Sequence, residues 1–169
     1  MDQSGATGIA LTCGLNYKPE LTMYERILVA TDGSTLSKKA VANAISLAQL
    51  CGAELVALKV VPRYPMSYFE GGVALQAGEV ARVETQWAES GQAIVDAVKK
   101  AALSKGVAVK AVTAKSDLVA EAIIAAAKKH KCDLIVMASH GRKGIKRLLL
   151  GSETQHVLTH SHIPVLVLR

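Results

Sequence analysis

The feature that most constrains the fold of this chain is a regular alternation between short apolar runs and helix-like stretches. The run at 134–138 is continuous rather than alternating in polarity, which is typical of a strand buried on both faces. Because strands that alternate with helices need crossover connections, the sequence predicts an α/β fold with a parallel sheet. Strands are predicted at 26–31, 55–61, 107–113, 133–138 and 165–168, with helices ending near residues 50, 104, 130 and 160.

The ends and buried faces of the helices follow from local signals. Ser34 is placed to cap the first helix, and Gly52 and Gly106 are placed to end the first and second. Either Ser116 or Asp117 is expected to cap the third helix. Apolar residues at helical spacing predict the core-facing stripe of the long second helix. That stripe consists of Val80, Val83, Trp87, Ile94, Val98 and Ala101.

The composition excludes several classes of protein. The chain has 169 residues, half of them apolar, which suits one domain with a sizeable core. No apolar run reaches the roughly 18 residues that a membrane span needs. The net charge of +6 favours anionic partners, but no long Lys/Arg block marks a nucleic-acid-binding protein. Cys13, Cys51 and Cys132 lack metal-ligand spacing and are interpreted as free thiols of a cytoplasmic protein.

Residues 1–22 have no clear periodicity, and Met23 stands directly before the first predicted strand. No basic region precedes the apolar patch at 9–11, so a signal peptide is not expected. We therefore predict an N-terminal extension at 1–22 and a single domain at 23–169. A partner-binding arm is the alternative interpretation of the extension.

Two strand-end turns are candidate parts of a ligand site. Asp32-Gly33-Ser34 follows the first strand, and Ser139-His140-Gly141 follows the fourth. Ligands of open parallel sheets bind at the carboxyl ends of strands. The two turns converge only if the first and fourth strands are neighbours, which the pattern alone leaves open.

The segment from Gly141 to Ser152 has the features of a phosphate site. A glycine directly after a strand lets a ligand approach the main chain. Ser152 with Gln155 three residues later predicts a capping box, so a helix with free N–H groups would begin at Gly151. The basic residues between the two glycines either steer phosphates or form a solvated face: Arg142, Lys143, Lys146 and Arg147.

Three motifs together resemble the universal stress protein family, over residues 23–169. They are Ile-Leu-Val-Ala-Thr-Asp-Gly-Ser at 27–34, Met-Ala-Ser-His-Gly-x9-Gly-Ser at 137–152, and Ile-Pro-Val-Leu-Val at 163–167. The resemblance implies an open five-stranded parallel sheet in the order 3-2-1-4-5, with helices on both faces, of the adenine-nucleotide alpha hydrolase-like class. It also implies a homodimer formed through the last strand at 164–168, where an edge strand offers unpaired main-chain groups.

The ATP-binding branch of that family carries Gly-x2-Gly-x9-Gly-Ser/Thr. Its later positions match Gly141, Gly151 and Ser152, whereas Ala138 stands at the first glycine position. The resemblance places Asp32 near ribose or a nucleotide-bound Mg²⁺, although a turn-forming role is the alternative. The other residues implied to contact the nucleotide are Ala30, Thr31, Val60, Met137, Arg142 and Glu153.

No catalytic group is evident. His140 has no partner that would form a dyad and is expected to pack or bond locally. His156 and His160 share a helix face but lack a third ligand, so a zinc site is not expected. P-loop, dinucleotide-binding and nucleophile-elbow motifs are absent from the sequence. The predicted function is therefore a non-enzymatic, ATP-binding regulator of the stress response. A nucleotide-free interaction module and a slow ATPase are the alternatives.

Overall fold

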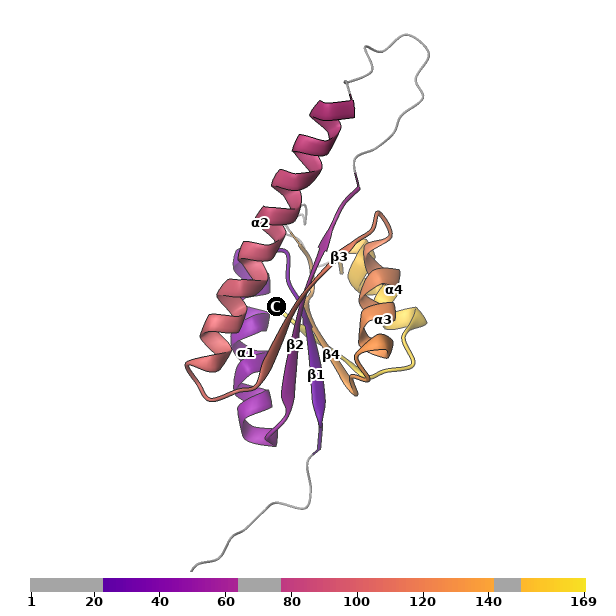
Figure 1. The fold of residues 1–169 in the computed structure, drawn as a ribbon. Helices are drawn as coiled ribbons and strands as arrows, with labels where there is room; N and C mark the ends of the chain where they lie inside the picture. The colour runs from indigo at the N-terminus through magenta and orange to yellow at the C-terminus, as the bar shows by residue number, and fades with distance from the viewer. Residues whose placement is uncertain (1–22, 64–76, 142–149) are drawn as a thin grey trace, which may run out of the picture.

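The structure, a computed structural model, describes residues 23–63, 77–141 and 150–169. Strands and helices alternate along the chain, as the apolar runs predict (Figure 1). The strands are β1 (Arg26–Ala30), β2 (Glu54–Val61), β3 (Val109–Lys115), β4 (Leu134–Ala138) and β5 (Val165–Leu168). The helices are α1 (Thr35–Cys51), α2 (Ala77–Leu103), α3 (Val119–Lys129) and α4 (Ser152–His160).

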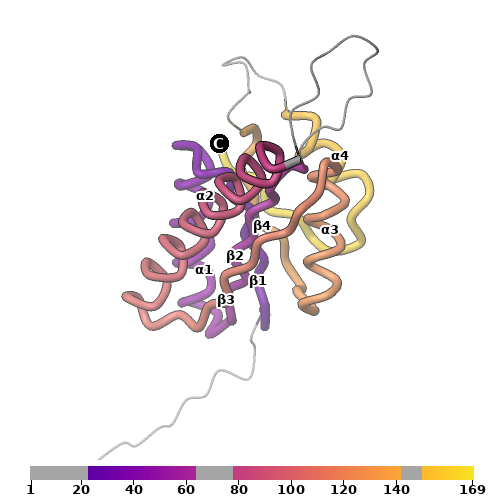
Figure 2. The backbone as a smooth tube through the Cα atoms, turned by 45° about the horizontal axis from the view of Figure 1, so that its top comes forward, coloured from indigo at the N-terminus to yellow at the C-terminus, as the bar shows by residue number. Residues whose placement is uncertain are grey.

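The strands form one parallel sheet in the order β3-β2-β1-β4-β5, which confirms the predicted fold class and strand order. Val29 of β1 lies opposite Ala57 of β2 and Val136 of β4. Helices α1 and α2 cover one face of the sheet, and α3 and α4 cover the other (Figures 1 and 2). The winding direction reverses between β1 and β4, so the turns after these strands lie side by side.

The sheet separates two layers of core. Beneath α1 and α2 lie Ile27, Val29 and Val136, together with Ala44 and Val95 from the helices. On the opposite face Leu28, Ile135 and Met137 pack against Ile123 and Val157. All residues of β4 are buried, which confirms the prediction of a strand covered on both faces. No helix in the described ranges is long and apolar enough to cross a membrane.

The predicted caps of α1 are confirmed. Ser34 Oγ accepts a hydrogen bond from the main-chain N–H of Ser37 at 3.2 Å, and Gly52 ends the helix in the left-handed region at φ 67°. Gly106 follows α2 with φ 73°. In both places glycine suits the backbone because it has no Cβ to crowd the preceding turn.

The predicted caps of α3 and α4 are wrong. The N-cap of α3 is Leu118, without a side-chain cap bond. Ser116 Oγ instead accepts the N–H of Leu118, and Asp117 Oδ1 accepts the N–H of Arg63. Ser116 thus bonds within its own turn, the usual local competitor of helix capping, whereas Asp117 holds the chain that follows β2.

At α4 the N-cap is Gly151, and Ser152 is the first helical residue. The predicted capping box of Ser152 and Gln155 is therefore wrong, and the N–H of Gln155 bonds the Gly151 carbonyl within the helix. Gly151 takes the cap position because its own N–H is held by the Ser139 carbonyl at 2.8 Å.

The predicted stripe of α2 is confirmed in part, because Val98 is buried and Val80, Val83, Trp87 and Ile94 are half-buried, but the centre of the buried face lies slightly to one side of it. The residues that reach the core are Gly91, Val95, Val98 and Ala102, whereas Ala101 is exposed. A Cβ on Gly91 would lie 2.6 Å from Val61 Cγ2, so α2 packs on β2 through a glycine. This close approach fixes the rotation of the helix, and a stripe counted from apolar residues alone misses it.

Candidate functional site

A pocket of about 280 Å³ opens at the carboxyl ends of β1, β2 and β4. It lies where the winding direction of the sheet reverses, the usual position of ligand sites in open α/β folds. The residues predicted from the sequence that line it are Ala30, Thr31, Asp32, Val60, Met137, Ala138, Gly141 and Glu153. Gly151 and Ser152 stand beside this pocket at the start of α4, and Arg142 lies outside the described residues.

One wall of the pocket is apolar. Leu58, Val60 and Met137 come from the strand ends, and Val119 and Ile123 come from the first turns of α3. Most apolar pocket walls of this kind receive the flat or aliphatic part of a ligand, while a few polar groups fix its orientation.

The polar end of the pocket is the turn after β1. Asp32 Oδ1 accepts the N–H of Ser34 at 2.9 Å, so this carboxylate does form the turn. Thr31 Oγ1 accepts the N–H of Gly33 and pairs with Ser37 Oγ at 3.1 Å. These bonds hold the Asp32 carboxylate at the mouth of the pocket, where it could accept hydroxyl hydrogens or contact a cation.

Gly141 lies very close to Asp32, whereas Gly151 has ordinary contacts around it. A Cβ on Gly141 would lie 2.8 Å from Asp32 Oδ2, so a side chain at this position would displace the Asp32 carboxylate. A Cβ on Gly151 would lie 3.4 Å from His140 Cα. Asp32, Gly141 and the amino end of α4 thus lie together at the carboxyl ends of β1 and β4, and that helix end favours negative charge.

Ala138 fits the structure without filling the pocket. Its side chain belongs to the core layer beneath α1 with Val29 and Val136, whereas Met137 belongs to the opposite layer. Its carbonyl accepts the hydroxyl of Thr154 at 3.0 Å. The extra methyl that distinguishes alanine from glycine therefore contributes to the core.

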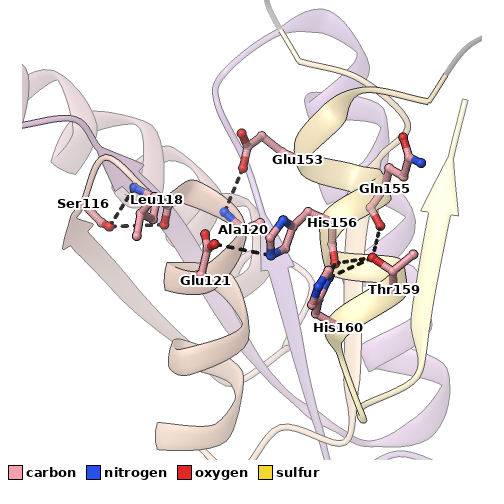
Figure 3. A network of polar contacts seen from close by, with 9 residues as sticks. All are labelled: Ser116, Leu118, Ala120, Glu121, Glu153, Gln155, His156, Thr159 and His160. Carbon is pink, nitrogen blue, oxygen red and sulfur yellow. Dashed lines mark hydrogen bonds and ion pairs between the residues drawn. The ribbon is translucent and has the colours of Figure 1, made fainter.

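Glu153 connects α4 to α3. Its carboxylate Oε2 accepts the main-chain N–H of Ala120 at 2.9 Å and so supplies the cap that α3 lacks (Figure 3). A carboxylate at the amino end of a helix is favoured by the helix dipole. The same side chain lines the pocket, so this bond fixes part of the pocket wall.

Sequence reasoning missed several lining residues: Ser37, Leu58, Lys59, Val119, Ile123 and Thr154. Thr154 is a polar residue on the buried side of α4, where it is only 2% exposed. A polar residue at such a helical position is the signal that could have identified it. His140 Nδ1 lies 3.2 Å from Ser139 Oγ, which confirms the expected local bond, and His140 also lines the pocket.

The two histidines of α4 face α3 rather than the pocket. The His156 and His160 rings stack with their centroids 4.0 Å apart, and His156 Nε2 lies 3.3 Å from Glu121 Oε1 (Figure 3). In the described part of the chain, no group of three or more His, Cys, Asp or Glu side chains could hold a metal ion.

Comparison with known proteins agrees with this geometry. The sequence profile of the universal stress protein family matches residues 23–169. A universal stress protein of Methanocaldococcus jannaschii is 36% identical over 148 residues, which cover 87% of this chain and 83% of that relative.

Among solved structures, UspA from Lactobacillus plantarum is 25% identical with a TM-score of 0.73, over 86% of this chain and 98% of its own. A universal stress protein solved in complex with cAMP is 26% identical with a TM-score of 0.63, over 86% of this chain and 97% of its own. The strand order, the pocket position and these similarities together show that the chain belongs to the universal stress protein family.

Proposed function

We propose that this chain binds an adenine nucleotide in the pocket at the carboxyl ends of β1, β2 and β4, and that it acts as a nucleotide-dependent regulator. The proposal rests on one observation: the same pocket has an apolar wall and a polar end, and the polar end is formed by Asp32, Gly141 and the start of α4. An adenine ring suits the wall, and phosphates suit a helix amino end. The relative solved with cAMP supports the same ligand class.

The proposed contacts follow from the positions of the described residues, and that of Arg142 follows from the sequence motif alone. Adenine lies against Val60 and Met137, and ribose hydroxyl groups bond the Asp32 carboxylate. The phosphates lie near Gly141 and the amino end of α4, and the remaining proposed contacts come from Ala30, Thr31, Ala138, Arg142, Gly151, Ser152 and Glu153. We infer ATP as the nucleotide; Asp32 would help to hold an Mg²⁺ ion bound to it, because carboxylate and phosphate oxygens together suit that ion.

The regulatory part of the proposal rests on linkage. A nucleotide that binds one conformation better shifts the protein toward it and stabilises the fold by mass action. We propose that the readout surface is a cytoplasmic homodimer formed through residues 164–168. β5 is an edge strand of the sheet, and its Leu166 is 39% exposed, which suits pairing with a second copy.

A nucleotide-free interaction module is the second candidate function, because Ala138 departs from the glycine of the ATP-binding motif. The packing of the Ala138 side chain beneath α1 weakens this candidate, since its methyl belongs to the core. A slow ATPase is the third candidate, and a phosphate-release assay under excess Mg-ATP is expected to show no turnover above the buffer rate.

The test begins with protein purified without added nucleotide. It is denatured, and the released small molecules are identified by mass spectrometry; calorimetric titration with Mg-ATP follows. We expect Gly141→Val to weaken binding by about a hundredfold or more, because its side chain displaces the Asp32 carboxylate and fills the phosphate approach.

Gly78→Ala is the matched control, since a Cβ at Gly78 meets no atom within 4 Å. It should bind as the parent does. A flat titration of the parent protein, or unchanged affinity in Gly141→Val, would contradict the proposed site.

A further inference from the structure

A second pocket lies at the other end of the strands, where β1 and β2 begin. It has a volume of about 280 Å³ and a floor that includes Val56. Arg26 lies opposite Glu54, and Val56 lies opposite Lys110, so these side chains share the face covered by α3. The residues at the end of α3 complete the wall: Lys129, His130 and Lys131.

The lining of this pocket carries a surplus of positive charge. Its cations are Arg26, Lys110, Lys129 and Lys131, and its one carboxylate is Glu54. That carboxylate is already paired, because Arg26 Nε donates to Glu54 Oε2 at 2.8 Å. Within the described ranges, no carboxylate lies within ion-pair distance of the three lysines.

Asp133, two residues after Lys131, forms no ion pair with the lysines. Asp133 is not part of the lining, and its carboxylate accepts the main-chain N–H groups of Glu25 and Arg26. The charge surplus therefore faces the pocket itself.

Lys131 provides an independent observation. At the ends of α1 and α2 the left-handed residue is glycine, namely Gly52 and Gly106, whereas at the end of α3 it is Lys131 with φ 54°. Among the described residues, Lys131 is the only non-glycine residue with positive φ. A Cβ destabilises this conformation, and such strain tends to occur at functional sites. Glycine at position 131 would favour folding, yet the chain has a lysine there, and its ammonium group lies at the pocket.

The helix dipole does not account for this cluster. Lysines near the end of a helix interact favourably with its last carbonyl groups. Lys110, however, comes from β3, and the His130 carbonyl is already bonded by Arg26 Nη1 at 2.9 Å. Burial lowers the pKa of His130, and Lys110, Lys129 and Arg26 lower it further against the opposing effect of Glu54. The cations therefore act together on a group at the pocket wall.

We propose that this basic pocket binds the phosphate groups of a small, multiply charged phosphate compound. The lining has cationic donors and little apolar surface, so it recognises the phosphates rather than an attached ring. The compound is either free polyphosphate or the phosphate tail of a nucleotide. The pocket lies at the opposite end of the strands from the nucleotide pocket and shares no lining residue with it, so this inference does not rest on the proposed function.

The test is a calorimetric titration of the full chain with tripolyphosphate, in the Gly141→Val background so that the other pocket does not contribute. We expect Lys110→Ala and Lys131→Gly each to weaken binding by about tenfold, the effect of losing one charge-assisted contact. Lys99→Ala removes the same charge from an exposed position of α2 and should leave the affinity unchanged. Lys131→Gly should keep or raise the thermal midpoint, so lost binding cannot be attributed to unfolding.

Two further measurements sharpen the result. Saturation with tripolyphosphate should raise the pKa of His130, because a bound anion offsets the neighbouring cations. The pKa is measured by NMR titration of the His130 ring. Displacement of tripolyphosphate by ATP in the same background would show that the pocket also accepts the phosphate tail of a nucleotide, and failure to displace it would restrict the ligand to free polyphosphate. A flat titration, or equal weakening by Lys99→Ala and Lys110→Ala, would overturn the proposal.

Discussion

Replacing Gly91 by alanine tests the packing of α2 on β2. On an exposed helix this change stabilises by about 0.5–1 kcal/mol, because alanine loses less backbone entropy than glycine. Here the new Cβ would lie 2.6 Å from Val61 Cγ2, about 0.8 Å short of the 3.4 Å at which ordinary contact begins. Val61 is 4% exposed and lies on β2, which is paired with a strand on each side, so it cannot easily move.

Overpacking by one methyl group costs about 1–3 kcal/mol. Subtracting the gain in helix propensity, we expect Gly91→Ala to destabilise the fold by about 1–2 kcal/mol. In a Val61→Ala background the obstructing methyl is absent, so Gly91→Ala should stabilise by about 0.5–1 kcal/mol. The sign of the effect therefore reverses, and the coupling energy is about 1.5–3 kcal/mol.

Urea denaturation of the four proteins of this cycle measures the coupling. The chain has a single tryptophan, Trp87 on α2, whose fluorescence reports the helix, and circular dichroism gives a second probe. The slope of the unfolding free energy against urea concentration should be the same for all four proteins, since the surface exposed on unfolding barely changes. If Gly91→Ala stabilises the parent protein, or if the two substitutions are additive, the close approach assigned to this glycine is refuted.

Four further predictions follow from other residues. Ala138→Gly should destabilise the fold by about 1–2 kcal/mol, from the lost core methyl and the added backbone entropy, yet leave nucleotide affinity within about twofold by calorimetry. Folding lowers the pKa of His130, so the unfolded chain binds that proton more readily and stability falls as pH drops below about 6.5; His130→Gln should reduce this decline in thermal melts at a series of pH values. Burial raises the pKa of the Cys132 thiol to about 11, so iodoacetamide at about pH 8 should leave it unlabelled in the folded protein and label it in concentrated urea, by mass spectrometry. Lys131→Gly should raise the free energy of unfolding by about 0.5–1 kcal/mol in urea, because the relief of left-handed strain exceeds the entropy cost of glycine.

Local patterns in the sequence were enough to predict much of the fold and part of the site. Continuous apolar runs identify buried strands, since a strand covered on both faces has no polar side to reveal. Ser34 and Gly52 mark the ends of α1 because capping depends on residues within one turn. The resemblance in motifs also led to residues such as Asp32 and Gly141, which the strand order β1-β4 brings into contact.

Other features depend on contacts between segments far apart in the chain, and only the tertiary structure decided them. Ser152 has the residue type of a helix cap, yet Gly151 takes that position because its N–H bonds the carbonyl at the end of β4. The cap of α3 comes from Glu153, 33 residues away. Such partners are set by the packing of elements and leave no local period.

The basic pocket likewise depends on contacts between segments that are far apart in the chain. Lys110 belongs to β3, and Lys131 follows the end of α3. The sequence alone does not distinguish either of them from an ordinary surface lysine. They meet at one pocket because the parallel register of β2 with β3 places Lys110 opposite Val56, beneath the end of α3. Sequence periodicity determines which face of an element is buried, whereas the strand order and the docking of each helix determine which side chains share a site.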